Sequence, residues 1–182
     1  MGNIELYRKL YAESGYGMGD TRMSAACIDL LAIPCRSSFL DVGCGRGEML
    51  EFVADNFLVV RGTEVVPELI GGAVMYGDAT DLPLPDNSFD VVTMLDVLEH
   101  LQPGDEIKAL KELGRVANRH ILVTANNGKS VLSDFVETEK DADLHINKRP
   151  LAEWDSIIRN NIPGTVKRLD ESRRSGRWRI DL

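Results

Sequence analysis

The sequence predicts an α/β fold: a doubly wound, mainly parallel sheet with helices on both faces and an antiparallel last strand. Short apolar runs typical of strands alternate with amphipathic stretches at helical spacing, which is the order that builds a parallel sheet. A glycine-rich turn joins one apolar run to the helix after it, as at the ligand-binding edge of such sheets. With 182 residues, 43% of them hydrophobic, the chain suits a single domain over residues 1–182.

The apolar patterns predict seven strands and four longer helices. The strands are expected over 38–43, 57–64, 73–78, 89–95, 119–126, 164–170 and 177–182. Apolar residues three and four positions apart predict helices over 21–32, 47–55, 103–117 and 151–161. The stretch between Glu64 and Asp78 is short for a full helix and a strand, so we expect a single helical turn there. The last two strands would form a closing hairpin, which makes the final strand antiparallel.

Charge and cysteine content narrow the function classes. The formal net charge of -8 disfavours non-specific nucleic-acid binding, which needs a basic surface. Three cysteines without a Cys-x-x-Cys pair argue against a disulfide framework and a zinc ribbon, so a reducing, cytoplasmic location and no metal are expected. No apolar run is long enough to span a bilayer. Basic residues are concentrated near the C-terminus: Lys167, Arg168, Arg173, Arg174, Arg177 and Arg179. This cluster indicates a solvated hairpin or, alternatively, a docking patch for an anionic acceptor.

The strongest local signal is the segment FLDVGCGRGEML at residues 39–50. An apolar strand ends in Asp41, and Gly43, Gly45 and Gly47 follow at alternate positions before a helix begins. Glycine permits positive φ and lets a ligand lie against the backbone, while the amides at the start of the helix face the same crevice. Because the spacing is G-x-G-x-G and not G-x-G-x-x-G, a nicotinamide-dependent oxidoreductase is disfavoured.

Two further acids follow the next two strands. Glu64 ends one of them, where a carboxylate can accept hydrogen bonds from both hydroxyls of a ribose, although a surface acid at a strand end is the alternative. Asp78 ends the next, where it can accept a hydrogen bond from an adenine amino group. Together with Asp41, these carboxylates would repel a pyrophosphate but tolerate a sulfonium cation. The pattern favours a phosphate-free adenosine ligand.

Residues 39–126 resemble a class I S-adenosylmethionine-dependent methyltransferase of the small-molecule type, with a methyltransferase type 11-like domain. The segment DVGCGRG at 41–47 is similar to the first motif of that family. The segments GDATDLP at 77–83 and DNSFDVV at 86–92 are similar to its adenine-binding region and fourth strand, and LEHL at 98–101 and Arg115-Val116 to the part after them. The resemblance implies a Rossmann-like methyltransferase fold and S-adenosylmethionine as the cofactor.

The resemblance also implies roles for particular positions. Asp41, Gly43 and Gly45, with Gly47 closing the turn, would hold the methionine part of the cofactor. Glu64 would bind the ribose, and the adenine would lie between Val65 and the Asp78-Ala79 pair. Leu95 and Asp96 would lie beside the methionine end of the cofactor. Tyr16 would contact the cofactor from a flap over residues 11–18.

Two histidines are candidates for catalysis. A base is needed only if the acceptor must lose a proton, and an imidazole titrates near neutrality. His100 follows the fourth strand near the expected methyl position, where a structural hydrogen-bonding role is the alternative. His145 lies in a segment where related enzymes build part of the acceptor pocket, and there an exposed polar loop is the alternative.

The expected function is methyl transfer to a small-molecule acceptor such as a metabolite, a sugar or a nucleotide-linked intermediate. The domain would comprise an N-terminal flap and helix over 1–35, a cofactor-binding half over 36–126 and an acceptor-side half over 127–182. Two alternatives stay open. One is an inactive module that binds S-adenosylmethionine and serves as a partner or regulatory subunit, and the other is a protein or RNA methyltransferase that needs a partner. The acceptor and the oligomeric state are left undefined.

Overall fold

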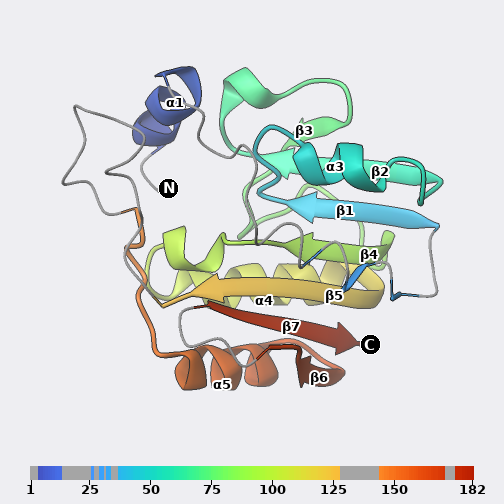
Figure 1. Cartoon of the computed structure of the whole chain (residues 1–182), viewed down its shortest axis with the longest axis vertical. Coiled ribbons are helices and arrows are strands. Elements are labelled where there is room, and N and C mark those ends of the chain that lie inside the picture. The colour runs from blue at the N-terminus through green and yellow to red at the C-terminus, as the bar shows by residue number, and fades with distance from the viewer. Residues whose placement is uncertain are drawn as a thin grey trace.

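Seven strands form one continuous sheet in a computed structural model of the chain, which describes residues 4–13, 26, 29–30, 32–33, 37–127, 144–170 and 175–182 (Figure 1). The strand order is β3-β2-β1-β4-β5-β7-β6. Neighbouring strands from β3 to β5 are parallel, whereas β7 is antiparallel to both β5 and β6. The strands are β1 (Ser38–Val42), β2 (Val59–Glu64), β3 (Val74–Tyr76), β4 (Phe89–Met94), β5 (Ala117–Asn126), β6 (Thr165–Arg168) and β7 (Ser175–Asp181).

The mainly parallel sheet and the antiparallel last strand are therefore confirmed. All seven strands form within or close to the ranges expected from the apolar runs. The strand expected to run on to Asp78 ends at Tyr76, and Asp78 instead makes an isolated bridge with Asp81. The backbone turns over residues 78–81, so Asp78 lies in a turn and not at the end of the strand.

The helices also follow the sequence pattern. The structure contains α1 (Ile4–Glu13), α3 (Glu48–Val53), α4 (Asp105–Val116) and α5 (Leu151–Asn161), with short turns η1 (Pro67–Leu69) and η2 (Leu98–His100). The turn η1 is the single helical turn expected before β3. Of the helix expected over 21–32, Ala26, Asp29 and Leu30 are helical, the expected last residue Ala32 lies in a turn, and the expected beginning lies outside the described residues.

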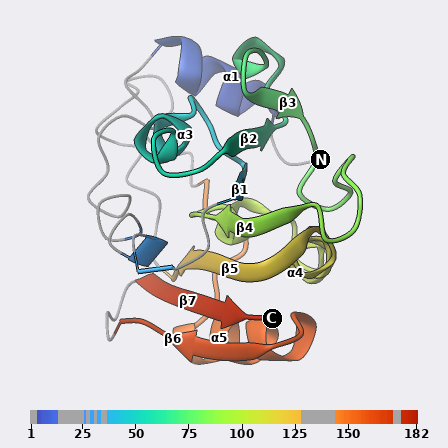
Figure 2. The same cartoon turned by 90° about the vertical axis from the view of Figure 1, so that its right-hand side faces the viewer.

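Helices cover both faces of the sheet (Figures 1 and 2). Consecutive residues of a strand point to opposite faces, and in this sheet they enter two different cores. Leu40, Val92 and Ile121 pack in the core that contains α4 and α5. Their neighbours Phe39, Val91 and Leu122 pack in the core that contains α3, Ala26 and Leu30. The central strands are mostly apolar because both of their faces are buried, which is the doubly wound arrangement.

The parallel strands bring their carboxyl ends to one edge of the sheet. The arrowheads of β1, β4 and β5 in Figure 1 point to the side on which α1 lies, and β7 points the other way. Segments that are distant in the sequence therefore meet at this edge: the turn after β1, the residues after β2 and the residues between β4 and η2. In the described part of the chain, no helix is both long enough and apolar enough to cross a membrane.

Candidate functional site

The turn after β1 is shaped by three glycines. Gly43, Gly45 and Gly47 have φ values of 73°, 55° and 84°. A Cβ atom on Gly43 would lie 2.6 Å from Cγ2 of Val97, and one on Gly45 would lie 2.7 Å from the hydroxyl of Tyr11. Both the backbone angles and the close neighbours thus require glycine. The turn is held between α1 and the segment after β4.

Asp41 supplies a buried carboxyl group beside this turn. Its side chain is 4% exposed, and its Oδ1 atom accepts a hydrogen bond of 2.5 Å from the hydroxyl of Thr93 on β4. Burial raises the pKa of Asp41 from 3.8 to about 7, the hydrogen bond from Thr93 opposes this rise, and the charge of Glu64 adds to it. A cationic ligand group placed nearby would favour the ionised form of Asp41.

Replacing Asp41 with asparagine is expected to change how stability depends on pH. The raised pKa means that the folded state holds a proton that the unfolded state has released between about pH 4 and about pH 7. The free energy of unfolding of the wild type therefore falls as pH rises through this window, by up to about 1.4 kcal/mol per pH unit from this group. Asp41→Asn lacks that contribution, because asparagine keeps the acceptor for Thr93 but does not titrate. Urea unfolding of both proteins across the window measures the difference, and parallel curves would contradict this account.

Glu64 connects the end of β2 to the glycine turn. Its side chain is 7% exposed, and its Oε2 atom accepts a hydrogen bond of 3.0 Å from the amide of Gly45. The other oxygen accepts hydrogen bonds from the amides of Val65 and Val66, at 2.7 Å and 3.1 Å. The carboxylate is thus fixed in orientation by three backbone donors. A carboxylate has about four lone-pair sites, so the group retains capacity to accept from a ligand.

Asp78 and Ala79 lie in the turn that follows β3. The Oδ1 atom of Asp78 accepts hydrogen bonds from the backbone amide of Thr80, at 2.9 Å, and from its hydroxyl, at 2.7 Å. The side chain of Ala79 is buried in the core that contains α4, whereas Val65 is half-buried. Asp78 is half-buried as well, so its position is set by the local turn.

Leu95 and Asp96 follow β4 at the same edge. Asp96 has a φ of 53°, which is rare for a residue other than glycine. Thr124 on β5 holds this conformation: its hydroxyl accepts from the amide of Asp96 at 2.7 Å and donates to the Oδ1 atom at 3.0 Å. Leu95 packs against the core that contains α3. Strain of this kind persists only where surrounding contacts enforce it, and it is concentrated at functional sites.

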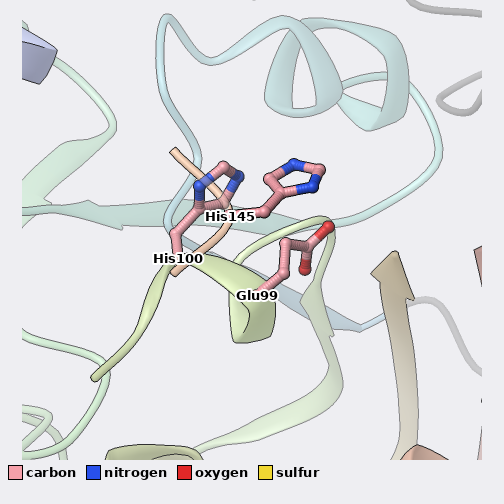
Figure 3. Close-up of side chains that lie close together, drawn as sticks. All are labelled: Glu99, His100 and His145. Atoms are coloured by element: carbon pink, nitrogen blue, oxygen red, sulfur yellow. The ribbon is translucent and has the colours of Figure 1, made fainter. Parts of the chain in front are cut away.

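The structure brings the two candidate histidines together. The rings of His100 and His145 lie side by side (Figure 3), in a T-shaped arrangement with centroids 4.8 Å apart. Tyr7 on α1 packs against His100 with a centroid distance of 5.8 Å. Glu99, which is 0% exposed, lies beside them on η2. The Nδ1 atom of His100 is 3.0 Å from the carbonyl oxygen of Leu144. The structural hydrogen bond expected as an alternative for His100 is therefore present, and His145 is buried rather than in an exposed loop.

Sequence reasoning missed several residues of this edge. Tyr11 was included only within the expected flap, and Tyr16, the flap residue given a cofactor contact, lies outside the described residues. Thr93 could have been found as a polar residue inside an apolar strand. Glu99 gave no usable signal, because a glutamate next to a histidine resembles an ordinary surface pair until the fold buries it.

Comparison with known proteins identifies a methyltransferase domain within the chain. Residues 40–120 match the family described as "Methyltransferase domain". The 27-O-demethylrifamycin SV methyltransferase of Amycolatopsis mediterranei is 26% identical, over 73% of this chain and 51% of that protein. The chain thus spans about half the length of that curated relative.

Solved structures share the fold over almost the whole chain. The PH0226 protein of Pyrococcus horikoshii superimposes with a TM-score of 0.72 at 16% identity, covering 97% of this chain and 98% of that chain. Magnesium protoporphyrin IX methyltransferase of Synechocystis, solved with bound SAH, gives a TM-score of 0.65 at 17% identity, covering 97% and 93%. The domain match, the relatives and the fold together support a class I S-adenosylmethionine-dependent methyltransferase with S-adenosylmethionine as its cofactor.

Proposed function

We propose that the chain transfers a methyl group from S-adenosylmethionine to a small-molecule acceptor. The observation that carries this proposal is the convergence of the glycine turn, the buried Asp41 and the fixed Glu64 at one edge, with the Glu99-His100-His145 group beside it. The residues fit the cofactor, because the glycine turn and two buried acids, Asp41 and Glu64, meet at this edge, where a carboxyl group can pair with a cationic ligand group. S-adenosylmethionine, when bound, supplies an electrophilic methyl group on a positively charged sulfur.

The cofactor-binding residues are proposed from their positions. Asp41 and the glycine turn would hold the methionine part, and Leu95 and Asp96 would lie along it. Glu64 would accept from the ribose hydroxyls, since its orientation is already fixed by three amides. The proposed adenine contacts are Val65, Asp78 and the amide of Ala79. Tyr16 and Gly47 complete the proposed set.

The acceptor side is proposed to contain His100 and His145. A carbonyl oxygen only accepts, so the Nδ1 atom of His100 donates to Leu144 and carries the ring proton of the neutral side chain. The basic nitrogen is then Nε2. His100 can receive a proton at this atom from an acceptor hydroxyl or amine, with His145 packed against its ring.

Two features support a small acceptor over a nucleic acid. The proteins named above include methyltransferases for demethylrifamycin and for magnesium protoporphyrin IX, both small molecules. Of the basic residues near the C-terminus that the structure describes, several are paired with neighbouring acids. Arg177 pairs with Asp29 and Asp170, and Arg179 pairs with Asp181. A surface neutralised in this way gives little electrostatic attraction for phosphates.

The test is transfer of a labelled methyl group from S-adenosylmethionine to separate pools of small metabolites, RNA and protein. Label in the small-molecule pool is the expected result. Label only in RNA or protein would show that the acceptor is that macromolecule and not a small molecule. Cofactor binding without label in any pool would support the inactive-module alternative. His120→Ala is the control for His100→Ala and His145→Ala, because His120 pairs with Asp181 away from the η2 turn.

The proposed domain organisation is one unit, with cofactor-binding residues in 36–126 and acceptor-side residues in 127–182 and the flap over 1–35. A cytoplasmic location is also proposed, on the cysteine pattern of the sequence. Limited proteolysis and cell fractionation are the respective checks.

A further inference from the structure

We infer that Glu99, His100 and His145 form a binding site for a divalent transition-metal ion of the zinc class. Each residue offers one ligand atom, and these atoms all lie within 4.8 Å of one another. Figure 3 shows the two rings and the carboxylate gathered at the η2 turn. Zinc binds imidazole nitrogen and carboxylate oxygen at about 2 Å, so small rotations of these side chains would bring them into a common coordination sphere. Two histidines and one carboxylate are a known ligand set for zinc with an open position.

The hydrogen bond to Leu144 prepares His100 for this role. It holds the proton on Nδ1 and leaves Nε2 as the nitrogen with the lone pair. Metal-bound histidines in proteins typically donate their other ring N–H to a carbonyl or carboxylate, which fixes the tautomer and the ring orientation. The backbone of the segment that carries His145 therefore also orients His100.

The segment over 144–150 is held rigidly against η2. The amide of Asn147 donates to the carbonyl oxygen of Glu99 at 3.0 Å. The Asn147 side chain donates to Glu106, which is 1% exposed, and Arg149 forms an ion pair with the same carboxylate at 2.7 Å. These contacts fix the distance between the two halves of the ligand set without using any of its side chains. A metal site needs such a supporting shell to keep its geometry.

Burial favours a cation at this position. Glu99 is 0% exposed and His145 is 7% exposed, so the attraction between the carboxylate and a bound divalent ion would be little screened by water. Neutral imidazoles add ligand atoms without adding positive charge. The site would then carry one ion with three protein ligands, which leaves at least one coordination position for water or for another ligand.

The site lies next to the proposed cofactor-binding edge. Val97, two residues before Glu99, is the side chain against which Gly43 is packed. The open coordination position is thus suited to an oxygen or nitrogen atom of the acceptor, an assignment that rests on the proposed function. With the ion bound, the Nε2 lone pair of His100 is used for coordination, and His100 acts as a ligand instead of as a base.

Metal binding is measured on the full-length chain after treatment with a chelator. Calorimetric titration with zinc chloride is expected to give one ion per chain, and cobalt(II) is expected to give the visible absorption of a low-symmetry nitrogen and oxygen site. His145→Ala and Glu99→Gln should each weaken zinc binding by at least about 100-fold, since loss even of an outer-shell partner costs 10- to 100-fold. His120→Ala, which changes the one histidine outside the cluster, should bind zinc as the wild type does.

Several results would overturn the inference. Absence of stoichiometric zinc binding by the wild type would do so, and the proton-accepting role of His100 would then stand. Equal zinc affinity of the wild type and His145→Ala, with both folded by circular dichroism, would also do so. Zinc binding with no methyl transfer to any acceptor would support the metal site and count against the proposed function. If chelator-treated and zinc-loaded protein transfer methyl groups at the same rate, the assignment of the open position to the acceptor is wrong.

Discussion

Glu64→Ala is expected to weaken S-adenosylmethionine binding by on the order of 10²- to 10⁴-fold. A hydrogen bond to a charged group contributes about 1.5–3 kcal/mol, and the proposed ribose contact contains two of them. The carboxylate is 7% exposed and is already fixed by the amides of Gly45, Val65 and Val66. The side chain therefore loses little conformational freedom on binding. Isothermal titration calorimetry with S-adenosylmethionine and with S-adenosylhomocysteine measures the change.

Two matched variants separate the effect of the Glu64 charge on cofactor affinity from a general effect of losing a glutamate. Glu64→Gln keeps the size of the side chain and one acceptor oxygen, so its affinity should fall between those of the wild type and the alanine variant. Glu51→Ala removes an exposed glutamate from α3 and should leave the affinity unchanged. Undiminished binding by a folded Glu64→Ala protein would refute the ribose assignment.

Gly43→Ala is expected to lower the free energy of unfolding by about 2–5 kcal/mol and to abolish measurable cofactor binding. A non-glycine residue in the left-handed region costs about 1–2 kcal/mol, and overpacking adds about 1–3 kcal/mol. Both apply here, because φ is 73° and the new Cβ would lie 2.6 Å from Cγ2 of Val97. Relief of that contact has to move either the glycine turn or the segment that leads to η2. Urea unfolding and calorimetric titration measure the two effects.

The chain contains its own control for backbone strain. Gly72 also has a positive φ, of 57°, but a Cβ there would meet nothing within 4 Å. Gly72→Ala should therefore lower the free energy of unfolding only by the cost of the backbone conformation. The additional loss in Gly43→Ala then measures the contact with Val97. In the Gly43→Ala background, Val97→Ala should restore part of the lost stability through removal of the collision. Equal costs at Gly43 and Gly72 would contradict the close packing of the turn.

The sequence predicts the sheet, and the edge at which Asp41 and Glu64 meet the glycine turn, for a physical reason. Strands buried on both faces are mostly apolar, as in the segments around Phe39 and Val91, so the runs are visible without any knowledge of tertiary contacts. Parallel strands then place the residues after them at a common edge. The positions of Asp41 and Glu64 beside the glycine turn follow from this regularity.

The acceptor side was less predictable because its contacts are between segments distant in the sequence. His100 and Leu144 are 44 residues apart, and no periodicity indicates that they meet. The burial of Glu99 depends on the same packing, which is why residue patterns alone do not indicate a metal site there. Tyr11 contacts Gly45 from α1, another long-range contact that residue patterns do not encode.

Calorimetric titration of the wild-type chain with S-adenosylmethionine, S-adenosylhomocysteine and NAD tests the central claim most directly. The account predicts saturable binding of both sulfur-containing ligands at one site per chain, with no binding of NAD. It also predicts that both affinities fall together in Glu64→Ala. Binding of NAD, or no binding of either sulfur-containing ligand, would contradict the assignment of this edge of the sheet as an S-adenosylmethionine site.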